Sequence, residues 1–303
     1  MLTMNSSPWL DEVLAPILKA KEEYDFELVI VDGGSKDNTI SKIRNLLKDN
    51  SLDIKVICES TGNLAHARNL GLKNASGDFQ SFIDSDIVVP DDFFDTMLGH
   101  LRDESVGIVG ARFELERDPP KGFVAKYYRN RRDIYRSGVH KADYTATACS
   151  FWPKKVVENL VIDERFHRAG EDVDFNLRIR ERGYTCLVDT DCVAWHVRTP
   201  TIKEELKRVW AHGESRALNL RLHWNSIGRG PRTLLASIVT LLGWTGLVLI
   251  PFIGAWGLIP FGIILVRQVI KLKKPWRVDH ALFGFFIYVT YTSRFLWGCL
   301  KYA

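Results

Sequence analysis

Acidic residues follow two short apolar stretches at the positions where ligands of α/β proteins bind. Asp32 follows Phe26–Val31, and Asp84-Ser85-Asp86 follows Phe79–Ile83. Both stretches predict buried strands, and ligands of open α/β sheets bind outside the carboxyl ends of the strands. Asp32 also begins an Asp-Gly-Gly-Ser sequence that is ideal for a turn. Asp32 therefore predicts either a turn or a carboxylate that accepts hydrogen bonds from a nucleotide base or ribose.

The pair Asp84 and Asp86 predicts a metal site. Two carboxylates one residue apart on a turn can converge on a hard cation such as Mg²⁺ or Mn²⁺, which prefers oxygen ligands. Such an ion bridges the oxygens of a diphosphate leaving group. The alternative is a charged turn before Pro90. Repulsion between two close carboxylates disfavours this alternative.

A third acidic cluster, Gly170-Glu171-Asp172, begins a predicted helix. Acidic residues at the positive end of a helix contribute ~0.3–1 kcal/mol, so this placement has a purely structural explanation. The same field keeps a carboxylate ionised, as a general base requires. His196 follows the short apolar run Val193–Trp195. It predicts a metal ligand only if it faces the aspartates, and a structural residue otherwise.

Composition limits the classes of protein to consider. The 303 residues are 46% hydrophobic and 26% charged, as in an ordinary globular protein. The formal net charge is only +4, and no basic stripe with interleaved aromatic residues is present, which argues against nucleic-acid binding. The five cysteines are scattered, which predicts neither a disulfide framework nor a zinc site and fits a reducing compartment. The first ten residues contain no signal peptide.

The first two-thirds of the chain alternates apolar runs with helical patterns, which predicts an α/β sheet. Strands are expected at 26–31, 54–57, 79–83, 106–109, 186–188 and 193–195. Helices are expected at 39–50, 64–75, 151–160 and 171–182.

The remainder of the chain predicts a membrane domain. Thr233–Val266 contains no charged residue, and Pro251 and Gly254 lie near its middle. This pattern predicts a tight hairpin of transmembrane helices, and His280–Leu300 predicts one more. We therefore expect a catalytic domain over 1–225 and a membrane domain over 232–303. The spans are expected at about 232–250, 252–270 and 280–300.

Charged residues near the expected spans predict the topology. The basic helix Ile202–Leu222 precedes the first span, and it either packs on the domain or lies in the membrane interface. Arginines and lysines also lie between the second and third spans. Because positive charge marks the cytoplasmic side, we expect a multi-pass membrane protein whose catalytic domain faces the cytoplasm.

Taken in order, four segments resemble family 2 glycosyltransferases. They are VIVDGGSKDNT (29–39), GNLAHARNLGLKNASGDFQSFIDSDIVVPDDF (62–93), GEDVDFNLRIRERGY (170–184) and VAWH (193–196). The resemblance spans most of residues 1–225. It implies the GT-A fold, an α/β domain with a Rossmann-like mixed sheet, followed here by the C-terminal transmembrane helices. Leu2–Asn5 looks like the first turn of the family with most of its strand missing.

The resemblance implies a role for each matching residue. On the donor side, Asp32 would hold the base, with Asn63 and Arg68 near the nucleotide, Asp84 at the ribose or a metal-bound water, and Asp86 and His196 on the metal. On the acceptor side, Asp172 would deprotonate a hydroxyl in an inverting displacement. Glu171 would bind the acceptor or support the base.

The function implied is transfer of one sugar from a nucleotide sugar to a hydroxyl of a lipid-linked or membrane-proximal glycan, as in surface polysaccharide biosynthesis. The donor would be a UDP-sugar, or alternatively a GDP-sugar, and the cofactor Mn²⁺ or Mg²⁺. No Gln-x-x-Arg-Trp motif of processive synthases follows the acidic helix, which favours single-sugar transfer. The alternatives are a polyprenyl-phosphate sugar synthase, whose phosphate acceptor needs no base, a nucleotidyltransferase, and a catalytically silent membrane scaffold.

Overall fold

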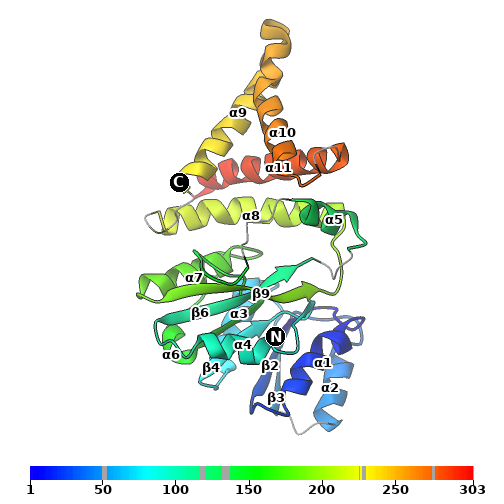
Figure 1. Ribbon diagram of the computed structural model, residues 1–303, viewed down its shortest axis with the longest axis vertical. Coiled ribbons are helices and arrows are strands. Elements are labelled where there is room, and N and C mark those ends of the chain that lie inside the picture. The colour runs from blue at the N-terminus through cyan, green and yellow to red at the C-terminus, as the bar shows by residue number, and fades with distance from the viewer. Residues whose placement is uncertain are drawn as a thin grey trace. The chain divides into compact units, whose positions relative to one another are not determined.

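The computed structural model describes residues 1–49, 53–115, 120–131, 137–224, 226, 230–274 and 277–302. The chain forms two compact units (Figure 1). The first comprises Met1–Pro119 and Tyr135–Thr199, and the second comprises Pro120–Ile134 and Pro200–Ala303. The division therefore falls at Thr199, whereas the sequence led us to expect it near 225.

A parallel three-stranded sheet begins the first unit. Its order is β1 (Leu2–Thr3), β2 (Glu27–Asp32) and β3 (Asp53–Cys58). The helices between and after these strands are α1 (Leu10–Ala20), α2 (Thr39–Asp49) and α3 (Leu64–Asn74). Residues 28–32 of β2 are all buried, as expected for a parallel strand covered on both faces. Asp32 thus lies at the carboxyl end of a buried strand, as predicted from the sequence.

The second sheet of this unit is mixed. Its order is β4-β8-β6-β9-β5, and β7 pairs with β9. The strands are β4 (Phe79–Ile83), β5 (Ile87–Val88), β6 (Val106–Glu114), β7 (Val139–Lys141), β8 (Cys149–Pro153) and β9 (Thr185–His196). Strands β6 and β9 run parallel, and the other pairs are antiparallel. Helices α4 (Phe93–His100), α6 (Lys154–Val157) and α7 (Glu171–Glu181) complete the unit. The predicted α/β fold with a mixed sheet is confirmed.

The predicted helix at 151–160 is wrong. Residues 149–153 form strand β8, which pairs with β4 and β6, and only the short helix α6 follows. The indole of Trp152 is fully buried and contacts the rings of Phe82 and Phe175, at centroid distances of 5.2 and 5.3 Å. A short apolar run fits a buried strand as well as a helix, and here tertiary packing decides between them.

The second unit is helical among its described residues. Its elements are α5 (Phe123–Asn130), α8 (Ile202–Leu222), α9 (Gly230–Ile253), the 3₁₀ helix η1 (Gly254–Leu258), α10 (Ile259–Ile270) and α11 (Val278–Lys301). Helix α8 packs along α11, where Gly213 and Gly298 allow close approach of the two backbones. The guanidinium of Arg294 in α11 pairs with Glu214 of α8 and lies 3.5 Å from the centre of the Trp297 ring. One side of the predicted basic helix is therefore used for packing within the unit.

The structure does not support the prediction of three transmembrane helices at about 232–250, 252–270 and 280–300. Helices occupy all three regions, but within the described part of the chain no helix combines the length and the apolar character needed to cross a bilayer. Helix α10 has only 12 residues. Helix α11 carries Asp279, Arg294 and Lys301, and its arginine is explained by the partner on α8.

A glycine in β6 provides a test of the packing within the first unit, where β6 lies against Thr145. A Cβ atom at Gly110 would overlap the side chain of Thr145, whereas nothing lies within 4 Å of a Cβ added at Gly99 in α4. We expect Gly110→Ala to lower the free energy of unfolding by about 1–3 kcal/mol through overpacking. The control Gly99→Ala should leave it unchanged or raise it by about 0.4–1 kcal/mol. Urea titration of both variants measures the difference, and equal effects would contradict the described packing.

Candidate active site

The guanidinium of Arg68 lies between two carboxylates from distant parts of the sequence. Its Nη2 donates to Asp84 Oδ2 and its Nε to Glu171 Oε1, each at 3.2 Å. Arg68 comes from α3, Asp84 from the end of β4 and Glu171 from the first position of α7. The side chain is only 3% exposed, and its guanidinium lies 4.9 Å from the centre of the Phe82 ring. Arg68 therefore brings together the acidic residue at the strand end and the one at the helix start.

Each member of this group has a buried polar atom without a hydrogen-bond partner. These atoms are Arg68 Nη1, Asp84 Oδ1 and Glu171 Oε2. A buried polar atom left unpaired costs about 1–3 kcal/mol, so native proteins contain few of them. Unpaired donor and acceptor atoms on three contacting residues indicate a site for a polar ligand.

The two acids at the start of α7 do not share the properties of surface carboxylates. Gly170 precedes them with a φ of +87°, a left-handed conformation that glycine adopts without strain. Burial, together with the charge of Asp172, raises the pKa of Glu171 to about 7, although Arg68 opposes this. Burial also raises the pKa of Asp172, opposed by the N–H of Val173 and by Arg68. A carboxylate whose pKa is raised towards neutrality suits proton transfer.

Asp86 and His196 lie side by side because of the pairing of β5 with β9. The register places Ile87 opposite His196, and His196 Nδ1 lies 3.3 Å from Asp86 Oδ2. Both side chains are partly exposed. Burial opposes ionisation, but the hydrogen bond and charge of His196, with the charge of Arg198, lower the pKa of Asp86 overall. The sequence predicts a metal ligand at His196 only if this residue faces the aspartates, and it does face Asp86.

This pair offers one carboxylate and one imidazole to a cation. Within the described parts of the chain, no group of three or more potential metal ligands is present. Mg²⁺ and similar ions keep several waters and use few carboxylates plus substrate phosphates. Asp86 and His196 therefore fit an ion whose other ligands are phosphate oxygens and water, rather than a closed structural site.

Asp32 forms the turn that its sequence predicts. Its carboxylate accepts hydrogen bonds from the N–H groups of Gly34 and Ser35 at 3.0 and 2.9 Å. It also accepts from the hydroxyls of Thr3 at 3.0 Å and Ser35 at 2.5 Å. The carboxylate thus fixes the loop after β2, and its implied contact with a nucleotide base stays a prediction.

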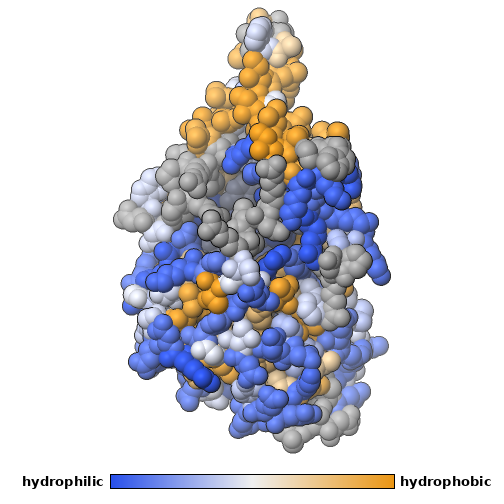
Figure 2. Space-filling view, in the orientation of Figure 1, coloured by the Kyte–Doolittle hydropathy of each residue, from blue (hydrophilic) through white to orange (hydrophobic). Residues whose placement is uncertain are grey.

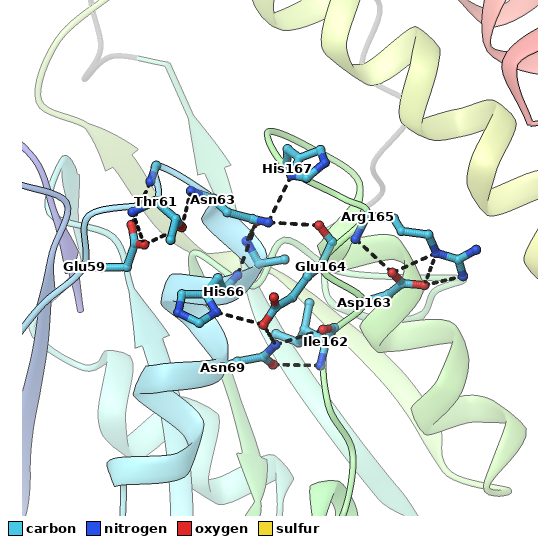
Figure 3. Close-up of polar contacts among 12 residues, drawn as sticks. Glu59, Thr61, Asn63, His66, Asn69, Ile162, Asp163, Glu164, Arg165 and His167 are labelled. Carbon is cyan, nitrogen blue, oxygen red and sulfur yellow. Dashed lines mark hydrogen bonds and ion pairs between the residues drawn. The ribbon is translucent and has the colours of Figure 1, made fainter.

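Asn63 is the N-cap of α3. Its Oδ1 accepts from the N–H groups of Ala65 and His66, at 3.0 and 3.3 Å. Its Nδ2 donates to the carbonyl of Glu164 at 2.9 Å and lies 3.0 Å from His167 Nδ1 (Figure 3). These contacts give Asn63 a positioning role, and its implied place near the nucleotide stays a prediction.

Two further residues of α3, which were not predicted from the sequence, hold the loop that leads to α7. His66 Nδ1 lies 2.9 Å from Glu164 Oε1, and Asn69 Nδ2 donates to the same oxygen at 3.1 Å (Figure 3). Asn69 also exchanges hydrogen bonds with the backbone of Ile162, at 2.8 and 2.9 Å. The spacing 63, 66 and 69 is a helical spacing of polar residues that could have revealed this face. Because Arg68 belongs to the same helix, these contacts help to hold it beside Glu171.

The raised pKa of Glu171 predicts a dependence of stability on pH. A carboxyl group whose pKa is higher in the folded state than its ordinary 4.5 lowers the stability as pH rises through about 7. Glutamine cannot ionise, so the wild type should lose stability as pH rises from about 5 to 8 and Glu171→Gln should not. The free energy of unfolding of the variant minus that of the wild type should therefore rise by on the order of 1–3 kcal/mol over this range. Urea unfolding at both pH values measures this gain. The control Glu158→Gln, at an exposed position after α6, should show none. A difference independent of pH would contradict the described burial.

Comparison with known proteins places this chain in a family. The model of the family described as "Glycosyl transferase family 2" matches residues 1–160, more than half of the chain. A transferase of Methanococcus voltae is 21% identical over 305 residues, with 93% of this chain and 89% of that protein covered. It is named dolichyl N-acetyl-alpha-D-glucosaminyl phosphate 3-beta-D-2,3-diacetamido-2,3-dideoxy-beta-D-glucuronosyltransferase. Chondroitin synthase of Pasteurella multocida is 26% identical over 68% of this chain, but the chain spans only 25% of that protein.

Solved structures show the same fold. The mannosyltransferase PcManGT from Pyrobaculum calidifontis, in complex with GDP-Man and Mn²⁺, matches with a TM-score of 0.62 and 17% identity, over 99% of this chain and 84% of that one. Residues 1–349 of S. aureus TarS, in complex with UDP, match with a TM-score of 0.52 and 15% identity, over 99% and 89% of the two chains. The expectation of a sugar-transferring enzyme with the GT-A fold is confirmed. The chain belongs to glycosyl transferase family 2.

Proposed function

We propose that this enzyme transfers a single sugar, with inversion, from a nucleotide sugar to a hydroxyl of a lipid-linked or membrane-proximal glycan. The observation that carries the proposal is the buried Arg68 group, in which one guanidinium joins Asp84 at the end of β4 to Glu171 at the start of α7. Its unpaired polar atoms offer hydrogen bonds to a polar substrate. A UDP-sugar is the proposed donor and a GDP-sugar the alternative, supported by the UDP and GDP-Man in the structures of similar proteins.

The donor end of the site is assigned to Asp84, Asp86 and His196. Asp86 and His196 would hold Mn²⁺ or Mg²⁺, which would neutralise the charge of the diphosphate leaving group. Asp84 uses one oxygen for Arg68 and keeps Oδ1 unpaired, so it can accept a hydrogen bond from the donor. Mn²⁺ in the complex of PcManGT supports a divalent cation in this role.

The acceptor end is assigned to Asp172. Its Oδ1 accepts the N–H of Val173 at 2.8 Å, which leaves Oδ2 to take the proton of an acceptor hydroxyl. Glu171, held by Arg68, supports this base and binds the acceptor. The pKa of Asp172 is raised, and a general base works best when its pKa lies near the pH of the reaction.

A polyprenyl-phosphate sugar synthase is the second candidate, because its lipid acceptor would also suit a membrane-proximal enzyme. Its acceptor phosphate is already ionised and needs no base, whereas the pKa values of Glu171 and Asp172 are raised here. The M. voltae relative is named for a dolichyl-linked sugar, which supports a lipid-linked glycan as acceptor. We place the reaction at the cytoplasmic side of a membrane, in agreement with the basic residues that flank the apolar segment.

Removal of the metal-binding carboxylate tests the donor end. Asp86→Ala should weaken Mn²⁺-dependent binding of UDP or GDP by at least ~10–100-fold, because it removes one of two protein ligands. Calorimetric titration of the nucleotide, with and without the cation, measures the loss. Asp91→Ala is the matched control, since this aspartate is 74% exposed and pairs only at the surface with Lys19. Equal nucleotide binding in the presence of a chelator would contradict the metal assignment.

Neutralisation of the proposed base tests the acceptor end. Asp172→Asn keeps the shape of the side chain, so nucleotide binding should be nearly unchanged, while transfer should fall by roughly 10²–10⁴. The remaining rate should also lose its acidic limb, since the group that must be ionised is gone. The measurement is incorporation of radiolabelled sugar into a lipid extract of membranes, with Glu181→Gln as the control on α7. Near-normal transfer by Asp172→Asn would favour the phosphate acceptor instead.

A further inference from the structure

Helices α9 and α10 and the 3₁₀ helix η1 form a hairpin, called here the apolar hairpin (Figure 1). Its described side chains leave much apolar surface in contact with solvent. Val248, Phe252 and Trp256 are 75%, 83% and 76% exposed. Other exposed apolar residues are Leu235, Ile238, Leu241, Leu242, Trp244 and Leu249 of α9, Leu258 of η1, and Ile259, Ile263, Val266 and Ile270 of α10. In Figure 2, orange covers most of the apolar hairpin. Soluble surfaces rarely expose apolar patches of this kind without a partner.

The two helices of the apolar hairpin form a fixed unit. A Cβ atom at Gly246 would meet the carbonyl of Gly257, and one at Gly243 would meet the ring of Phe261. The backbones therefore approach closely, and small residues make this possible. The exposed apolar side chains are held by a packed element and not by a loose loop.

Two exposed polar groups of the apolar hairpin are satisfied within the protein. The exposed Thr245 donates its hydroxyl hydrogen to the carbonyls of Leu241 and Leu242, at 3.1 and 3.0 Å. The indole N–H of Trp244 donates to Ser293 Oγ at 3.1 Å. Residues 233–266 contain no charged side chain. These features suit hydrocarbon, where no water is present to satisfy a polar group.

Helix α9 has 24 residues, but the depth of the apolar hairpin below the cations at the end of α10 is limited by the length of α10. Helix α10 has 12 residues, which is ~18 Å at the rise of an α-helix. The hydrocarbon core of a bilayer is ~30 Å thick, so α10 matches one leaflet.

A cluster of cations follows the apolar hairpin. The sequence between Val266 and His280 contains five basic residues and one acidic residue. The basic residues are Arg267, Lys271, Lys273, Lys274 and Arg277. The acid, Asp279, is paired with Arg277 at 2.6 Å. A basic cluster beside an apolar element suits the phosphate groups of anionic lipids.

We propose that the apolar hairpin inserts into a single leaflet of an anionic membrane, with the basic cluster at the level of the lipid headgroups. The exposed apolar residues lie on both helices, and on α9 they cover a wide face, at 235, 238, 242 and 249 as well as 241, 244 and 248. A fluid lipid phase contacts such a surface from several directions, whereas one protein partner covers one face. The insertion does not depend on the sugar-transfer chemistry, so either proposal can fail alone.

Binding of the full chain to vesicles tests the insertion. The wild type should bind vesicles of phosphatidylcholine with phosphatidylglycerol, and Phe252→Asp or Trp256→Asp should weaken binding at least ~10-fold because apolar burial is lost. Trp224→Asp is the matched control, because this tryptophan is 58% exposed and lies outside the apolar hairpin. Lys273→Gln combined with Lys274→Gln should weaken binding to anionic vesicles ~10–30-fold and leave weak binding to pure phosphatidylcholine unchanged.

Labelling of the tip tests the depth. A cysteine introduced as Trp256→Cys should be protected in vesicles from an impermeant maleimide added outside or trapped inside, as read from the mass of the peptide that contains residue 256. Labelling by the trapped reagent would mean that the tip reaches the far side, and would overturn insertion into one leaflet. The proposal is also overturned if the wild type fails to bind anionic vesicles, or if the aspartate variants bind as the wild type does. Dimers that these variants abolish, without vesicle binding, would assign the surface to a second copy of the chain.

Discussion

Burial of a charged guanidinium costs much free energy unless carboxylates lie beside it. The buried position of Arg68 therefore requires that three elements of the fold meet. Helix α3 must present Arg68, strand β4 must end beside it with Asp84, and α7 must begin beside it with Glu171. Removal of one member of a buried ion pair leaves an uncompensated charge and costs about 3–5 kcal/mol. The two acids depend on Arg68 in turn, because Glu171 and Asp172 repel each other and the cation offsets this repulsion. The group therefore ties the donor end of the site to the acceptor end.

The surrounding contacts can be understood from this requirement. The polar face of α3 holds the loop before α7 through Asn63, His66 and Asn69. On the other side, Asn176 of α7 exchanges hydrogen bonds with the backbone of Thr145, each at 3.1 Å. Thr145 in turn packs against Gly110 of β6. Helix α7 is thus fixed from two directions, which keeps Glu171 and Asp172 in place although their ionised forms are disfavoured by burial.

Local sequence signals were sufficient where a residue's neighbours in the chain decide its environment. The apolar run before Asp84 predicts β4 with the observed bounds, and the acids after Gly170 predict the start of α7. Contacts between distant segments could not be read in this way. The approach of His196 to Asp86 depends on the register of β5 against β9, and the pairing of Arg68 with Glu171 joins residues more than 100 positions apart. The same limit explains the error at 151–160, where pairing with β4 and β6 selects a strand.

The C-terminal region shows the same distinction. Its apolar composition is evident from the sequence, but the sequence does not show that Arg294 of α11 meets Glu214 of α8. Nor does it show that α10 ends after 12 residues. Helix length and partner choice depend on tertiary packing, so an apolar segment alone predicts an affinity for apolar surroundings and not the way in which it enters them.

The central claim is that the Arg68 group and its neighbours form a site for transfer of a sugar from a nucleotide donor. The most direct measurement is release of nucleoside diphosphate by the purified full chain from a panel of UDP- and GDP-sugars, each with Mn²⁺, Mg²⁺ or chelator. The account predicts release from one donor or a small set of donors, which requires the cation and increases when a membrane lipid extract supplies the acceptor. Absence of release from every donor, together with absence of nucleotide binding, would contradict it.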